Sequence, residues 1–207
     1  MTGLQALRYA GAPWSSAPTV LILGGSGGTG HAAIQLAKAL GAGRVITTCS
    51  PDNFDFVRGL GADEVIDYHT QDWATVLAPG SLQVVYDCVS LPGTGDKALG
   101  LLADGGSFVT LLPGAQPSDA AKDARPGVST FYFICNQTST ADLDVVRGFA
   151  NEGKLQMVVQ ETFHGLGSVP MAFETMMTGH TVGKISLDFA SGAGLLQRRR
   201  LRPHKRV

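Results

Sequence analysis

Short runs of consecutive apolar residues alternate along the chain with stretches in which apolar positions recur at helical spacing. Residues 20–23 (VLIL) form such a run and lead into glycines, which is typical of a parallel strand buried on both faces. Residues 31–40 then predict a helix that ends at Gly41. A second strand is expected over residues 44–48, and the Ser-Pro-Asp sequence at 50–52 favours the start of another helix.

The same alternation continues along the chain and indicates the fold class. Further strands are expected over residues 64–67, 83–87, 107–112, 128–135 and 184–189, and further helices over residues 72–77, 96–102, 141–152 and 169–177. In the helix over 141–152, Leu143, Val146 and Phe149 are expected to face inward. Strands separated by helices predict βαβ units with right-handed crossovers. We therefore predict an α/β protein of the Rossmann type, a doubly wound parallel sheet of about six strands in three layers.

These patterns divide the chain into three segments. Residues 1–18 contain a helical stretch with no strand before it, and we interpret them as a remnant linker helix. Residues 19–189 form the predicted dinucleotide-binding domain, in which residues 113–127 are expected to be a loop because Ala, Pro, Asp and Gly dominate. Residues 190–207 form a basic tail that we expect to be disordered.

The formal net charge of −1 hides an uneven distribution. All 17 acidic residues precede residue 190, so the chain before the tail, with ten basic residues, carries −7 and the tail carries +6. Such a block of like charge could contact nucleic acid, but it is more often solvated chain, so no nucleic-acid partner is predicted.

Composition excludes several classes of protein. The sequence is 44% hydrophobic and 16% charged, which is enough apolar material for a packed core. No apolar run reaches the roughly 18 residues of a membrane span, and the first residues lack the pattern of a secretory signal. Cys49, Cys88 and Cys135 are far apart and lack metal-ligand spacing, which favours reduced thiols and no metal. We expect an intracellular protein, cytoplasmic rather than mitochondrial.

The turn between the first strand and the first helix, GGSGGTG, carries the candidate chemistry. Its G-x-G-x-x-G pattern falls on Gly25, Gly27 and Gly30 in a strand-turn-helix context, which predicts a dinucleotide site. Gly25 permits the turn, Gly27 lets the backbone touch the pyrophosphate, and Gly30 lets the helix pack closely on the strand. The N–H groups of Gly28 and Thr29, with the helix dipole, are expected to face the anion.

The same turn has two rival interpretations. It also reads as the nucleophile elbow G-x-S-x-G, with Ser26 as nucleophile and His164 or His180 as base. A hydrolase normally has several strands before its elbow, whereas Ser26 follows the first expected strand. A short-chain dehydrogenase would need a Tyr-x-x-x-Lys pair, and no tyrosine of this chain is followed by lysine at that spacing.

The end of the second strand bears on the choice between NAD and NADP. An NAD site usually places an acid there to bind the ribose 2′-hydroxyl. This chain has Cys49 and Ser50 instead, and Ser50 could bond to a 2′-phosphate. Asp52 would repel that phosphate if it pointed inward, but after Pro51 it is better interpreted as an acid in the first turn of a helix. We favour NADP(H) over NAD(H), although no Arg or Lys stands in the expected place.

Several motifs, in sequence order, resemble the medium-chain dehydrogenase/reductases: VLILGGSGGTG, AIQLAKALGAGRVITTCS, LGADEVIDY and GHTVGKISLDF. The resemblance covers about residues 3–189 and is closest to the zinc-independent branch of quinone oxidoreductases and enoyl reductases. It implies an NADPH-dependent oxidoreductase of quinones or α,β-unsaturated carbonyls, in which the nicotinamide delivers hydride without a metal. It also implies a homodimer joined through an edge strand near residues 128–135.

The resemblance assigns further residues to the cofactor site. Ser50, Asn53 and Tyr68 would surround the 2′-phosphate. The remaining implied residues are Cys88 and Val89 at the adenosine and ribose, Leu111 and Leu112 at the nicotinamide ribose, Phe133 and Ile134 near the nicotinamide, and Lys184 near the phosphates. The residues alone allow core packing for Tyr68 and Phe133 and a solvated strand end for Lys184. No catalytic residue or proton donor is identified.

The chain departs from this family at its start. Family members carry a GroES-like domain that forms one wall of the substrate cleft, whereas Met1 falls where their linker helix begins. We therefore expect this chain to bind NADP(H) but to reduce quinones or enones poorly, because positioning and exclusion of water supply most of the rate. The alternative is a truncated, non-catalytic module that binds nucleotide or dimerises.

Overall fold

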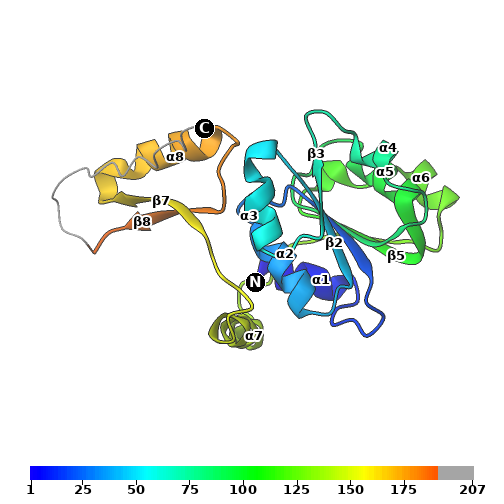
Figure 1. The fold of residues 1–207 in the computed structure, drawn as a ribbon, viewed down its shortest axis with the longest axis horizontal. Coiled ribbons are helices and arrows are strands. Elements are labelled where there is room, and N and C mark those ends of the chain that lie inside the picture. The colour runs from blue at the N-terminus through cyan, green and yellow to red at the C-terminus, as the bar shows by residue number, and fades with distance from the viewer. Residues whose placement is uncertain (191–207) are drawn as a thin grey trace.

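The computed structural model describes residues 1–190, which form a six-stranded parallel sheet between helices and a smaller lobe beside it (Figure 1). The strand order is β3-β2-β1-β4-β5-β6, the order of a Rossmann fold. The strands are β1 (Thr19–Leu23), β2 (Arg44–Cys49), β3 (Glu64–Asp67), β4 (Leu82–Asp87), β5 (Leu102–Thr110) and β6 (Ser129–Tyr132). The predicted fold class is confirmed. The basic tail expected over residues 190–207 lies outside the described residues, apart from Ala190.

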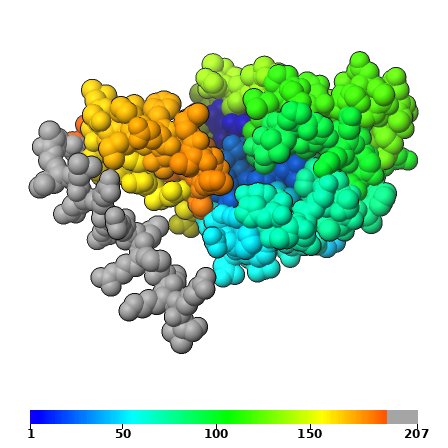
Figure 2. Space-filling view, turned by 90° about the horizontal axis from the view of Figure 1, so that it is seen from above, coloured from blue at the N-terminus to red at the C-terminus, as the bar shows by residue number. Residues whose placement is uncertain are grey.

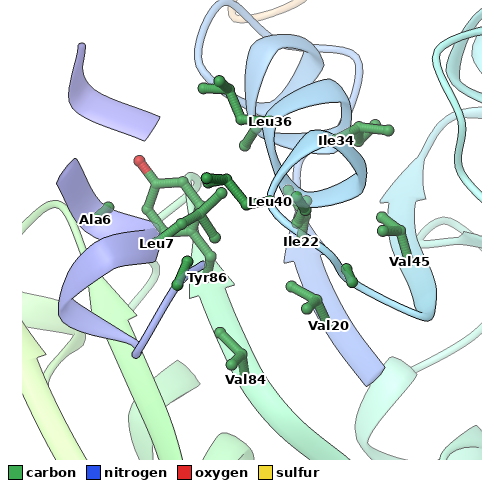
Figure 3. Close-up of a cluster of buried hydrophobic side chains, with 14 of the residues drawn as sticks. Ala6, Leu7, Val20, Ile22, Ile34, Leu36, Leu40, Val45, Val84 and Tyr86 are labelled. Carbon is green, nitrogen blue, oxygen red and sulfur yellow. The ribbon is translucent and has the colours of Figure 1, made fainter. Parts of the chain in front are cut away.

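Apolar side chains alternate between the two faces of the sheet, so both faces are buried. In β1, Val20 and Ile22 belong to one core cluster, whereas Leu21 and Leu23 belong to the other. Helices covering the first cluster are α1 (Thr2–Tyr9), α2 (Gly30–Ala39), α3 (Phe54–Gly59) and α7 (Thr140–Asn151); those covering the second are α4 (Trp73–Val76), α5 (Thr94–Leu101) and α6 (Asp119–Ala124). Figure 3 shows part of the first cluster, in which Tyr86 of β4 lies beside α1.

The helix α7 corrects one expectation about the core. Val146 and Phe149 pack against the first cluster as predicted, but Leu143 is 49% exposed, so its inward orientation is wrong. Asp142 takes the inward position instead, because its carboxylate accepts a hydrogen bond of 2.6 Å from Nε2 of Gln5 on α1. This bond lowers the pKa of Asp142 and joins α7 to α1.

The segment expected to be a loop, residues 113–127, contains regular structure. The short 3₁₀ helix η2 (Pro113–Ala115) is followed by α6, which begins where Oγ of Ser118 accepts a hydrogen bond of 3.2 Å from the N–H of Ala121. The high content of Pro, Gly and Asp hid this N-cap, since a serine followed by an acid favours a helix start. Other 3₁₀ turns are η1 (Pro51–Asn53) and η3 (Leu166–Ser168).

A C-terminal lobe of β7 (Val159–His164), α8 (Val169–Met177) and β8 (Lys184–Asp188) stands apart from the main sheet (Figure 1). The strand expected over residues 184–189 is β8, but it pairs in parallel with β7 rather than with the main sheet. No pattern predicted β7, because polar residues interrupt its apolar ones. The lobe is too small to bury its apolar side chains, and large ones remain exposed: Leu166, Phe173, Met176, Met177 and Phe189.

Candidate functional site

A cleft of about 770 Å³ lies at the carboxyl ends of β1, β2, β3 and β4. The strand order changes direction between β1 and β4, which is the point where open α/β sheets bind ligands. The opposite wall is the segment between α8 and β8, residues 179–181. Figure 2 shows the hollow between this orange segment and the cyan and green body. Its size is in the range of small-molecule and cofactor sites.

The glycine turn between β1 and α2 depends on three residues without side chains. Gly24 has a left-handed φ of +77°, so it rather than Gly25 makes the sharp bend. A Cβ at Gly25 would lie 2.1 Å from Oγ1 of Thr47, and a Cβ at Gly30 would lie 2.1 Å from the carbonyl oxygen of Gly24. The predicted close packing at Gly30 is therefore present, and Gly25 also serves close packing.

The N-terminus of α2 is suited to an anion. Thr29 is its N-cap but makes no side-chain capping bond, and the first turn holds no acid. Among residues 1–190, no hydrogen bond engages the N–H groups of Gly28 and Thr29. Ser26 and Gly27 line the cleft, and a Cβ at Gly27 would meet only the carbonyl oxygen of Gly24, at 3.4 Å. Free amides at the positive end of a helix, beside an open glycine, fit a diphosphate group.

Lys184 adds a positive charge to this turn from the C-terminal lobe. Its Nζ lies 3.0 Å from the position that a Cβ of Gly28 would occupy. The approach is fixed by the backbone, because the N–H of Gly183 donates a hydrogen bond of 2.8 Å to the carbonyl oxygen of Ser26. Lys184 does not line the cleft itself, but its ammonium group lies over the turn that carries the free amides.

The residues assigned to a 2′-phosphate come together at the ends of β2 and β3. Ser50, Asn53 and Tyr68 all line the cleft, and Nδ2 of Asn53 donates a hydrogen bond of 2.9 Å to Oγ of Ser50. Tyr68 is 49% exposed and contacts the ring of His69 edge-on, with the centroids 4.3 Å apart, so it is not a core residue. Asp52 is exposed and does not line the cleft, in line with its interpretation as a first-turn acid.

The structure brings together only some of the other predicted residues. Cys88 and Val89 line the cleft at the end of β4. Phe133 is buried and contacts the ring of Tyr9 at 5.4 Å between centroids, while Ile134 is 73% exposed. These last two, like Leu111 and Leu112, do not line the cleft, and their roles stay predictions.

The end of β4 is shaped by a buried carboxyl group. Oδ1 of Asp87 accepts hydrogen bonds from the N–H groups of Val89 (3.0 Å) and Ser90 (2.7 Å). The turn they hold gives Ser90 a left-handed φ of +62°, and it directs the chain at Val89 along the cleft. Burial raises the pKa of Asp87. Burial likewise raises the pKa of the Cys49 thiol to about 11, so this cysteine is a protonated thiol near neutral pH, in line with the prediction of reduced thiols.

Sequence reasoning missed much of the wall beyond Tyr68 and Val89. An ion pair crosses this part of the cleft, since Nζ of Lys97 donates to Oδ2 of Asp72 at 2.8 Å and lowers the pKa of that carboxyl. Most of these residues follow β3 or β4 directly, so the rule that ligands bind beyond the carboxyl ends of parallel strands could have identified them from the sequence. The missed lining residues are His69, Thr70, Gln71, Asp72, Trp73, Leu91, Thr94, Lys97, Gly179, His180 and Thr181.

The geometry gives no support to the hydrolase alternative. His164 lies in the lobe and its Nδ1 is 3.2 Å from Oδ2 of Asp188. His180 and Ser26 both line the cleft, but no hydrogen bond joins Ser26 to a histidine within residues 1–190. The same residues contain no group of three or more potential metal ligands. They also contain no helix that is long and apolar enough to cross a membrane.

Comparisons with known proteins agree with this architecture. A family model described as zinc-binding dehydrogenase matches residues 60–187. A quinone-oxidoreductase homolog of Spinacia oleracea, named as chloroplastic, is 33% identical over 82% of this chain and 52% of its own length. An Arabidopsis thaliana protein named NADPH-dependent alkenal/one oxidoreductase, chloroplastic, is 33% identical over 83% of this chain and 41% of its own length. The expected cytoplasmic location therefore stays a prediction.

A solved structure extends the comparison to the whole fold. The quinone oxidoreductase from Coxiella burnetii superposes with a TM-score of 0.79 at 30% identity, covering 91% of this chain and 57% of that chain. The chain spans about half the length of the curated relatives it matches.

Proposed function

We propose that this chain is the cofactor-binding part of an NADPH-dependent oxidoreductase, because it belongs to the medium-chain dehydrogenase/reductases. Within that family, which the matching model describes as zinc-binding dehydrogenase, it belongs to the branch of quinone oxidoreductases and enoyl reductases that work without zinc. One observation carries this proposal: Ser26 and Gly27 line a cleft at the point where the strand order reverses, and the next two residues, Gly28 and Thr29, have N–H groups that make no hydrogen bond within residues 1–190. Lys184 supports it by adding a positive charge at the same turn.

Each part of the cleft has a proposed task in binding the cofactor. The backbone N–H groups of Gly28 and Thr29 would hold the pyrophosphate, with the Lys184 ammonium group compensating its charge. Cys88 and Val89 would border the adenosine ribose at the end of β4. When bound, the cofactor supplies a hydride from its nicotinamide to the acceptor carbon. No residue of this chain is assigned as proton donor.

Preference for NADP(H) is the finer part of the proposal. Ser50 and Asn53 offer hydrogen-bonding groups at the end of β2, where an NAD site usually has an acid. Tyr68 presents its exposed phenol to the same corner of the cleft. The nearest acid in sequence, Asp52, is exposed outside the lining. A 2′-phosphate therefore has donors at this corner, and the acid that does line the cleft, Asp72, is paired with Lys97.

The hydroxyl of Tyr68 provides a test of that preference. Tyr68→Phe is expected to raise the Kd for NADPH about tenfold, because a hydrogen bond to a charged group is worth about 1.5 kcal/mol or more. The Kd for NADH should stay within about twofold, since NADH has no 2′-phosphate. Tyr9→Phe, another exposed tyrosine outside the cleft, is the matched control in fluorescence titrations. Equal losses for both nucleotides would contradict the assignment.

Quinones or α,β-unsaturated carbonyls are the proposed acceptors, by analogy with the named relatives. Large apolar side chains of the C-terminal lobe, including Phe173 and Met177, are exposed, so this chain alone does not shield them from water. We therefore expect NADPH oxidation with a quinone panel to be at least about 100-fold slower than with a full-length relative. Turnover at the rate of the relative would contradict this expectation.

A non-catalytic module that binds nucleotide or dimerises is the alternative function, and one feature bears on its dimerisation. β6 is at an edge of the main sheet, so its outer backbone groups are available to pair with a second copy of the chain. We propose a homodimer through this edge, in either case. Analytical ultracentrifugation of the chain measures its mass, and a monomer at all concentrations would contradict the dimer.

A further inference from the structure

The C-terminal lobe meets the body against the N-terminal half of α2. The chain leaves the body through residues 156–158 and passes the same place again at residues 183–184, where β8 begins. The two passes are hydrogen-bonded to each other, because the N–H of Lys184 donates to the carbonyl oxygen of Val158 at 2.8 Å. The lobe is therefore connected to the body beside the glycine turn.

Gln35 of α2 anchors the outgoing pass. Its Nε2 donates to the carbonyl oxygen of Gln156 at 2.9 Å, and its Oε1 accepts from the N–H of Gln156 at 2.8 Å. Nε2 also donates to the carbonyl oxygen of His31 at 3.0 Å. The side chain is only 9% exposed, so these bonds form largely away from water. A buried side-chain amide that pairs with both the backbone N–H and the backbone carbonyl group of one distant residue fixes that residue in position.

His31 provides a second anchor one turn earlier on α2. Its Nδ1 lies 2.9 Å from the carbonyl oxygen of Gly27, and its Nε2 accepts a hydrogen bond of 3.4 Å from the N–H of Val158. Burial lowers the pKa of His31, which favours the neutral ring that can accept this bond. The imidazole thus joins the glycine turn to the outgoing pass.

These contacts form a continuous path from α2 to the charge over the glycine turn. Gln35 holds Gln156, the chain continues to Val158, and Val158 holds the backbone of Lys184. Nζ of Lys184 then lies next to Gly28. Lysine is a long and flexible side chain, so its position depends on how firmly its backbone is held. Without the Gln35 anchor, the lobe could shift and carry the ammonium group away from the turn.

We propose that Gln35 is a positioning residue of the cofactor site, which holds the base of the C-terminal lobe so that Lys184 faces the pyrophosphate. This inference rests on the proposed function, namely that the glycine turn binds a nicotinamide dinucleotide. Gln35 does not line the cleft, so its effect on binding must pass through Lys184. That dependence distinguishes a positioning role from a general contribution to stability.

A double-mutant cycle on the full chain tests the dependence, with the Kd for NADPH as readout. Lys184→Met is expected to raise the Kd about tenfold, and Gln35→Ala about fivefold. In the Lys184→Met background, Gln35→Ala should add less than about twofold, because the charge that it positions is already absent. Lys38→Ala, one turn further along α2, removes a half-buried side chain that pairs with Asp63 outside the cleft, and it should leave the Kd unchanged.

A second readout does not need the nucleotide. Gln35→Met, which keeps the length of the side chain, replaces Gln35→Ala in the cycle if the alanine variant fails to fold. In either variant, the amide of Lys184 is expected to exchange its hydrogen faster than in the unchanged chain, by about tenfold. Three results would overturn this inference alone: a Kd in the double variant that is raised by the product of the two single effects, an unchanged Kd for the Gln35 variants, or unchanged hydrogen exchange at the Lys184 amide. Absence of NADPH binding by the unchanged chain would overturn the proposed function, and the inference with it.

Discussion

A Gly27→Val variant is expected to lose NADPH binding, with the Kd raised at least about 100-fold, while the protein stays folded. Gly27 lines the cleft, and a Cβ placed on it would meet only the carbonyl oxygen of Gly24, at 3.4 Å. The fold can therefore accept a side chain at this position. A branched side chain would instead occupy the space in which the pyrophosphate must approach the free amides.

The measurement combines titration with thermal unfolding. The variant should show no saturable binding up to about 100 times the Kd of the unchanged chain, and its Tm should fall by less than about 4 °C. Gly148→Ala is the matched control, because a Cβ at Gly148 meets nothing within 4 Å and this glycine does not line the cleft. Retained NADPH affinity in Gly27→Val would mean that the diphosphate does not lie against this turn.

Gly30→Ala, unlike Gly27→Val, is expected to destabilise the fold itself. The new Cβ would lie 2.1 Å from the carbonyl oxygen of Gly24 and 2.8 Å from Cα of Gly25. These are backbone atoms of the turn between β1, an interior strand of the sheet, and α2, so they cannot move aside cheaply. Overpacking of this kind costs roughly 3 kcal/mol, which for a chain of this size lowers the Tm by about 6–12 °C.

Calorimetric unfolding distinguishes this effect from ordinary helix propensity. Gly100→Ala in α5 is the matched control, because a Cβ at that helical glycine meets nothing within 4 Å. The control should gain up to about 1 kcal/mol, since alanine favours helix over glycine. A Gly30→Ala protein as stable as the unchanged chain would show that α2 does not pack on β1 as closely as described.

The central part of the fold could be predicted from the sequence because its signals are local. The apolar run of residues 20–23, the glycine turn and the helix that follows it are contiguous, and they form β1, the turn and α2. The remaining strands of the main sheet each coincide with an expected run, although β5 and β6 have different limits. Buried parallel strands read as continuous apolar runs, so the sequence marks them strongly.

What could not be predicted depends on contacts between distant segments. β7 is polar at most positions and forms only by pairing with β8, 20 or more residues later. Leu143 yields the inward position to Asp142 only because Gln5 lies opposite. The residues beyond Tyr68 in the cleft follow a strand end without any motif of their own, and only the assembled sheet brings them to the site.

The candidate site follows the same division. The glycine turn was predicted with its context, and Ser50, Asn53 and Tyr68 lie together in the cleft as the resemblance implied. The resemblance also placed Lys184 near the phosphates, but its anchoring through Gln35 crosses more than 100 residues of sequence. Spacing along the chain carries no information on such a contact.

The central claim is that bare amides at the start of α2, with a lysine from the lobe, hold a nicotinamide dinucleotide by its diphosphate. Isothermal titration of the unchanged chain with NADPH and with NADH tests it most directly. The account predicts one saturable site for each nucleotide, with NADPH bound at least about fivefold more tightly. Absence of binding heat from both nucleotides at several temperatures, in a sample whose circular dichroism shows the folded chain, would contradict it.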